Sequence, residues 1–149
     1  YTNGVAAGKW DRNYVVSGRT EIEQALFLKN TILNASAVVM RADALRGVFA
    51  RHREEIEGLR FAGDWAVYLN LLAQGDIAYS ALSKNLHRRH QSSVTISNFN
   101  ERQLDEIIAM QRKARGMIGA DAERDRRMGA YIAELRKQFG LEPALSAKA

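Results

Sequence analysis

The chain has 149 residues, of which 46% are hydrophobic and 26% are charged, a balance typical of one soluble globular domain. It contains no cysteine, which excludes a disulfide framework and a zinc site built from thiolates. The net charge of +5 would attract an anionic partner, but acidic residues are interleaved with most of the basic stretches, as on an ordinary solvated surface.

The amino-terminal part of the sequence predicts helices separated by short extended segments. Residues 1–20 mix glycine, asparagine and aromatic residues without a period, which indicates mostly loop. A helix is expected from Thr20 to about Asn30, because threonine is a good helix cap and acidic residues follow it. Small and β-branched residues predict a short buried strand at residues 36–40, and a helix should follow from residue 42 to about residue 55.

The middle of the chain predicts one apolar helix between extended pieces. Residues 59–61 should be extended, and Asp64 can cap a helix that ends before Gly75. Residues 76–81 alternate apolar and polar side chains, which predicts a strand. A second extended piece is expected at residues 86–90.

Two long helices are expected in the last third of the chain. The first should run from about residue 100 to residue 115, with Gly116 and Gly119 interrupting it. The second should run from about residue 121 to residue 139 and end at Gly140. Apolar residues at 4-3-4 spacing give this last helix a seam that can pack on the domain or on another helix: Met128, Ile132, Leu135 and Phe139.

Three stretches stand out together by their order and separation. They are NTILNASAVVMR at residues 30–41, AGDWAVYLNLLAQG at 62–75 and NLHRRHQSSVT at 85–95. Together they resemble the second half of the catalytic domain of family 2 inverting glycosyltransferases, nearest to bacterial members that build polysaccharide or lipopolysaccharide. The resemblance covers about residues 30–118 and implies a helix-rich α/β fold, the acceptor-side half of a GT-A (Rossmann-like) domain, with about five helices and a few short strands. Residues 1–118 would then belong to the catalytic domain, and residues 119–149 would form a charged carboxy-terminal helix and tail.

Asp64 is the residue to which the resemblance gives the chemistry. In the family, an acidic residue at a helix start takes the proton from the acceptor hydroxyl as that oxygen attacks the anomeric carbon, which is general base catalysis. The alternative is that Asp64 only caps its helix. Gly63 stands where many relatives have glutamate, so a hydrogen bond from that glutamate to the acceptor is missing. Trp65 is a candidate for stacking on an acceptor sugar, and a core position is its alternative role.

The other two stretches supply further candidates on the same basis. Asn34, Ser36 and Arg41 match family positions that shape the floor under the acceptor, although each can equally serve a structural role in a turn, a buried strand or an ion pair. In the third stretch, Arg88 and Arg89 are candidates for binding the diphosphate, and His90 is the candidate metal ligand. Alternate residues of an extended segment share a face, so Arg88 and His90 should point together. A basic surface strand is the alternative.

The resemblance also implies what lies outside this chain. The family holds Mn²⁺ or Mg²⁺ through an Asp-x-Asp motif, and this sequence contains none. The chain begins with Tyr1, and we expect it to be part of a longer enzyme whose other half binds the metal and the nucleotide-sugar donor. The isolated chain should therefore bind no metal and transfer no sugar.

The expected partners are a nucleotide-sugar donor, a glycan or lipid-linked acceptor and the remainder of the parent chain. No apolar run approaches the roughly 20 residues that cross a bilayer, so the expected location is the cytoplasm, including the inner face of the membrane. The alternative from another class is a small basic helical module that binds nucleic acid, but few aromatic residues accompany its arginines. A third reading is a protein-interaction module that uses the last helix.

Overall fold

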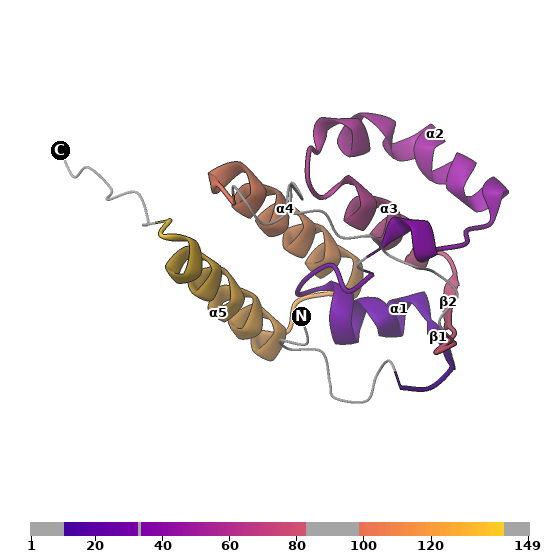
Figure 1. Ribbon diagram of the computed structural model, residues 1–149, viewed down its shortest axis with the longest axis horizontal. Helices are drawn as coiled ribbons and strands as arrows, with labels where there is room; N and C mark the ends of the chain where they lie inside the picture. Colours follow the sequence, from indigo (N-terminus) through magenta and orange to yellow (C-terminus); the bar gives the residue numbers. More distant parts are fainter. Residues whose placement is uncertain (1–10, 33, 83–98, 142–149) are drawn as a thin grey trace.

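A computed structural model describes residues 11–32, 34–82 and 99–141. In this part the chain is helix-rich and carries one small two-stranded antiparallel sheet (Figure 1). The elements follow in the order β1 (Tyr14–Ser17), α1 (Gly18–Glu21), the π-helical turn η1 (Ile22–Leu26), the 3₁₀ turn η2 (Ala35–Ala37), α2 (Ala42–Gly58), α3 (Gly63–Leu72), β2 (Asp76–Tyr79), α4 (Glu101–Ile118) and α5 (Ala122–Phe139). The helix-rich expectation is confirmed, while the described part shows no Rossmann-like sheet.

The sheet joins two segments that are far apart in the sequence. Tyr14 of β1 lies opposite Tyr79 of β2, and their rings stack with centroids 5.3 Å apart. The strand at residues 76–81 is confirmed as β2, but β1 was not expected, because residues 1–20 read as loop. Four residues are too few to establish a period by themselves, so β1 depends on the partner strand for its identity.

The strand predicted over residues 36–40 is wrong. Asn34 caps the turn η2 instead, since its Oδ1 accepts hydrogen bonds from the Ser36 backbone N–H (3.2 Å) and from the Ser36 hydroxyl (2.7 Å). Asparagine and serine side chains compete in this way with strand pairing. Val39 lies in the irregular segment that follows, and 99% of its surface is exposed. β-Branched residues favour a strand only where a neighbouring strand pairs with them, and no strand pairs with this segment among the described residues.

The helix predicted at residues 20–30 begins and ends earlier than expected. Ser17, rather than Thr20, is the N-cap, and its Oγ accepts the Thr20 backbone N–H at 3.1 Å. After one α-helical turn the helix widens into the π-helical turn η1, and the helix ends with Phe27 as its C-cap. A capping serine and threonine three residues apart are both plausible from sequence, so the packing of the whole segment selects between them.

The two last helices agree closely with the sequence. Asn100 caps α4 and Asp121 caps α5, each accepting a backbone N–H three residues on, and Gly140 ends α5 with a φ of 65°. Gly116 does not interrupt α4, which continues to Ile118 and ends at Gly119 with a φ of 88°. Positive φ at both terminal glycines is the conformation that glycine adopts most readily.

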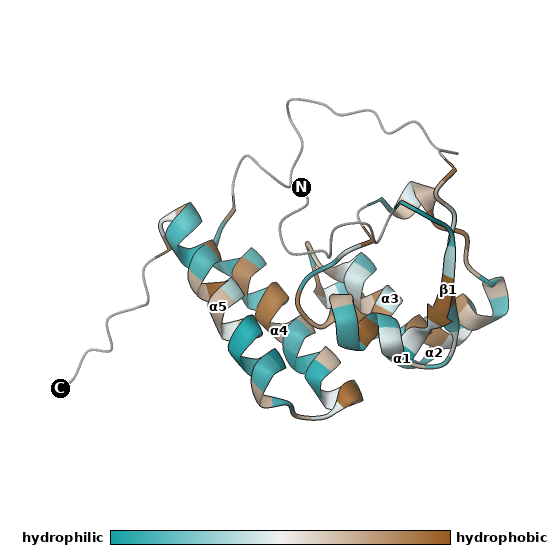
Figure 2. Ribbon diagram, turned by 90° about the horizontal axis from the view of Figure 1, so that it is seen from below, coloured by the Kyte–Doolittle hydropathy of each residue, from teal (hydrophilic) through white to brown (hydrophobic). Residues whose placement is uncertain are grey.

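Helix α3 lies in the core, where it contacts α1, η1, α2 and α4. Its buried side chains include Trp65, Tyr68, Leu69 and Leu72, as the helical spacing predicted. α4 and α5 run beside each other as a hairpin (Figure 1), and the rings of Phe99 and Phe139 stack 4.2 Å apart at one end of it. Figure 2 shows hydrophilic residues along much of α5, which therefore packs through a narrow apolar seam. Among the described helices, none combines the length and the apolar character that a bilayer span requires.

Candidate functional site

Asp64 lies in the first turn of α3, where it is the second residue of the helix. The N-cap is Ala62, so the expectation that Asp64 caps this helix is wrong. One carboxylate oxygen, Oδ1, accepts the Trp65 backbone N–H at 2.7 Å, and the other, Oδ2, accepts Nδ2 of Asn30 at 3.2 Å. Asn30 is itself held by the Ile32 backbone N–H, which donates to Asn30 Oδ1 at 3.1 Å. The carboxylate is thus fixed from both sides.

The surroundings of Asp64 favour its protonated form. Burial raises the pKa of the Asp64 carboxyl above its usual range, although the hydrogen bonds from Trp65 and Asn30 oppose this shift. Asp64 as a whole is nevertheless exposed, so its carboxylate is partly surrounded by protein but can still be reached from solvent. The net effect is a carboxylate that binds a proton more tightly than an ordinary aspartate.

Two buried hydroxyl groups accompany this carboxylate. Tyr68 lies one turn further along α3 and is only 3% exposed. Burial and the charge of Asp64 raise the pKa of Tyr68 to about 12. Within the described ranges, neither the Tyr68 hydroxyl nor Oγ1 of Thr31, the neighbour of Asn30, has a hydrogen-bond partner. Such groups are costly to bury, so this part of the molecule is polar without being fully satisfied.

Of the two roles considered for Trp65, stacking on a sugar or packing in the core, the structure shows the core position. The residue is 3% exposed, and its indole N–H donates to the Leu26 carbonyl at 3.0 Å. Gly63, before Asp64, has room for a side chain, since a Cβ there would lie 3.5 Å from the Ile56 carbonyl oxygen. The asparagine that hydrogen-bonds to the Asp64 carboxylate is Asn30 and not Asn34. Asn34 and Ser36 hydrogen-bond to each other within the turn η2.

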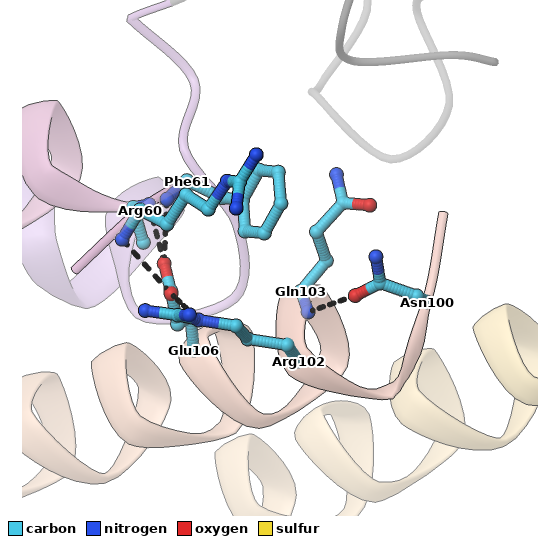
Figure 3. A network of polar contacts seen from close by, with 7 residues as sticks. Arg60, Phe61, Asn100, Arg102, Gln103 and Glu106 are labelled. Carbon is cyan, nitrogen blue, oxygen red and sulfur yellow. Dashed lines mark hydrogen bonds and ion pairs between the residues drawn. The ribbon is translucent and has the colours of Figure 1, made fainter. Parts of the chain in front are cut away.

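A second carboxylate holds the turn that leads into α3 (Figure 3). Glu106 of α4 accepts three consecutive backbone N–H groups, those of Arg60 (2.9 Å), Phe61 (2.7 Å) and Ala62 (2.9 Å). The side chain of Glu106 is 8% exposed, and Nε of Arg102 lies 3.4 Å from its Oε1. We call the backbone of residues 60–62 with this carboxylate the Glu106 turn.

The hydrogen bonds of the Glu106 turn outweigh the cost of burying its charge. Burial alone would raise the pKa of Glu106, but three backbone N–H groups and Arg102 favour the ionised form and lower the pKa below its usual range. Sequence reasoning missed this residue, because Glu106 lies among the polar positions of a long amphipathic helix.

The remaining predicted site residues, Arg88, Arg89 and His90, lie outside the described residues. In the part of the chain that the structure covers, no group of three or more His, Cys, Asp or Glu side chains could hold a metal ion. No family model, curated protein or solved structure matches the chain. The resemblance to glycosyltransferases accordingly rests on the residues of the three sequence stretches.

Proposed function

We propose that this chain forms the acceptor side of an inverting glycosyltransferase and that Asp64 is its general base. The observation that carries the proposal is the environment of Asp64. Its carboxylate is held by Asn30 and by the Trp65 backbone, it remains open to solvent, and its pKa is raised by burial. A fixed and accessible carboxylate with increased basicity is what proton removal from an alcohol requires.

The proposed step follows from the lone pairs of Asp64. Each carboxylate oxygen accepts one hydrogen bond from the protein, and an ionised carboxylate offers about four acceptor sites. A free site can accept the acceptor's hydroxyl proton. As the proton moves to Asp64, the hydroxyl oxygen bonds to the anomeric carbon, and the bond from that carbon to the nucleotide diphosphate breaks on the opposite face. The sugar is transferred with inverted configuration.

The position of Asp64 at a helix start does not by itself account for its environment. Asp43 is also the second residue of its helix, α2, but its carboxylate is exposed and pairs with Arg41 at 3.2 Å. Hydrogen bonding to Arg41 lowers the pKa of Asp43, whereas burial raises that of Asp64. Two aspartates at equivalent helix positions therefore differ in the property that a base needs, and Asp43 provides a matched control.

The donor side of the reaction is assigned to residues beyond the described part. Arg88 and Arg89 remain the proposed diphosphate ligands and His90 the proposed metal ligand. Because the sequence has no Asp-x-Asp motif, the nucleotide sugar and Mn²⁺ or Mg²⁺ are proposed to bind mainly to another part of the parent enzyme.

In calorimetric titrations of this chain with UDP-glucose and GDP-mannose, with and without Mn²⁺, we expect weak binding that does not depend on the metal. Tight, metal-dependent binding would show a complete donor site.

The decisive experiment compares Asp64→Asn with Asp43→Asn in the complete enzyme. Asp64→Asn should lower kcat for sugar transfer by about 100-fold or more, since the amide cannot accept the proton. Donor binding, measured by calorimetry, should stay unchanged. Asp43→Asn should leave transfer near the wild-type rate. An Asp64→Asn enzyme with most of its activity would remove Asp64 from the mechanism.

A further inference from the structure

We infer that Glu106 is a positioning residue for Asp64, acting through the backbone of residues 60–62 that its carboxylate holds. The inference rests on the proposed function, because it concerns how the base is presented. Glu106 does not touch the reacting atoms. Its part is to fix the geometry from which the first turn of α3, and Asp64 with it, begins.

Among the described residues, the carboxylate of Glu106 is the acceptor for all three backbone N–H groups of the Glu106 turn. Ala62, the N-cap of α3, has no side chain that can accept a hydrogen bond, and its N–H is buried. The neighbouring N–H groups of Arg60 and Phe61 point to the same carboxylate (Figure 3). Without an acceptor, three donors would lose their partners at one place, and a turn in that condition rearranges.

Any rearrangement of this turn reaches Asp64 directly. The Ala62 carbonyl accepts the Ala66 N–H at 3.0 Å, the hydrogen bond that starts α3 around Asp64. Ala62 precedes Asp64 by two residues, so a change of its backbone angles alters the direction of the Asp64 side chain. The contact to Asn30, at 3.2 Å, would be the first to lengthen.

Helix α4 also binds the segment that leads to Asn30, the side chain that contacts Asp64. Five residues after Glu106, Gln111 is buried and donates from Nε2 to the Leu28 carbonyl at 2.9 Å. Leu28 lies two residues before Asn30, the side chain that binds Asp64 Oδ2. One helix therefore binds both the turn at 60–62 that leads to Asp64 and the segment just before Asn30, which contacts the Asp64 carboxylate. Such support from packed elements is what keeps a reacting group in place.

The charge of Glu106 matters for this role, and not only its shape. Its two oxygens both accept, Oε1 from Arg60 and Oε2 from Phe61 and Ala62. A glutamine would have one accepting oxygen and would direct an NH₂ group at the remaining donors. Glu106→Gln is therefore nearly isosteric but cannot hold all three N–H groups.

The inference is tested in the 149-residue chain by NMR, with the Asp64 side-chain carboxyl carbon as the probe. In Glu106→Gln, amide hydrogen exchange at residues 60–62 should speed up by about tenfold or more, the loss expected for hydrogen bonds to a charged group. The titration of the Asp64 carboxyl should then shift from its wild-type position, because both its burial and its hydrogen bond from Asn30 depend on the position of this turn. The control Glu101→Gln removes an exposed carboxylate from the same helix and should change neither reading.

Glu106→Asp keeps the charge with a shorter side chain and covers the case in which Glu106→Gln does not fold. It should shift the Asp64 titration in the same direction by a smaller amount. The inference is overturned if amide protection at residues 60–62 is lost in either variant while the Asp64 titration stays at its wild-type position. This readout needs no sugar transfer, so it can fail or succeed independently of Asp64's role as a base.

Discussion

The two ends of α3 are held by different kinds of contact. At the amino end, a side-chain carboxylate from α4 binds three backbone N–H groups. At the carboxyl end, backbone meets backbone: the Gly18 N–H donates to the Gly75 carbonyl at 2.9 Å, and a Cβ on Gly18 would lie only 1.9 Å from the Leu72 carbonyl oxygen. A contact made by a charged side chain responds to pH and to conservative substitution, whereas close backbone packing tolerates no added atom. The proposed base, Asp64, lies at the amino end of α3, which is held by the charged side chain.

Gly18→Ala should have the largest effect on stability. The methyl group would overlap two backbone carbonyls, those of Leu72 and Gly75, which cannot move aside as a flexible side chain could. We expect the free energy of unfolding to fall by about 3 kcal/mol or more, measured by urea denaturation. Gly129→Ala in the middle of α5, where a Cβ meets nothing within 4 Å, is the control and should raise stability by about 0.5–1 kcal/mol. Equal effects at the two glycines would show that backbone contact does not fix this end.

Glu106→Gln should come second, with a loss of about 2 kcal/mol at pH 7. The size follows from charge-assisted hydrogen bonds that the amide replaces only in part. Urea denaturation at pH 7 measures it, with Glu101→Gln as the control.

The pH dependence of this loss follows from the lowered pKa of Glu106. A group whose pKa is lower in the folded than in the unfolded state stabilises the protein above the unfolded value, here 4.5, and this contribution disappears as the pH falls through the folded pKa. The difference between wild type and Glu106→Gln should therefore be constant from pH 6 to pH 8 and shrink in acid below the unfolded value. A difference that stayed constant in acid would mean that the carboxylate's charge does not hold the turn.

Asp64→Asn should change stability little, by about 0.5 kcal/mol or less at pH 7, because removing the cost of a buried charge is opposed by the loss of one hydrogen bond to the carboxylate. Burial raises the Asp64 pKa in the folded state, so the protein is favoured while the group is protonated and loses that advantage as the pH rises through the folded pKa. A neutral amide removes this cost, and the gain should vanish below the ordinary value of 3.8. A clear loss of stability at pH 7 would assign Asp64 a structural role like that of Glu106.

Glu101→Gln should have the smallest effect. Its carboxylate lies 3.3 Å from Arg136, and its side chain is 53% exposed, so solvent and salt screen the pair. The free energy of unfolding should change by about 0.5 kcal/mol or less, and by less still in 0.5 M NaCl. A larger loss would mean that the α4–α5 hairpin depends on this ion pair, and Glu101 would no longer serve as a control.

The sequence by itself determined the long helices and much of their burial. Residues 121–139 were predicted to form a helix ending at Gly140, and the structure has α5 from Ala122 to Phe139 with Asp121 as its cap. Periodicity and end signals suffice for such an element, because the hydrogen bonds of a helix join residues that are close in the sequence. The same locality identified α2 and the buried face of α3, whereas β2 was identified by its alternation of apolar and polar residues.

The tertiary structure alone decided the short elements and the support of the candidate site. Residues 36–40 have strand-forming side chains but no pairing strand, and β1 is a strand only because β2 lies beside it. Asp64 could be named from its motif, yet its partner Asn30 is 34 residues away in the sequence and Glu106 is over 40 residues from the turn that it holds. Contacts at such separations leave no periodic trace in either segment, since each is satisfied only when packing brings the other to it.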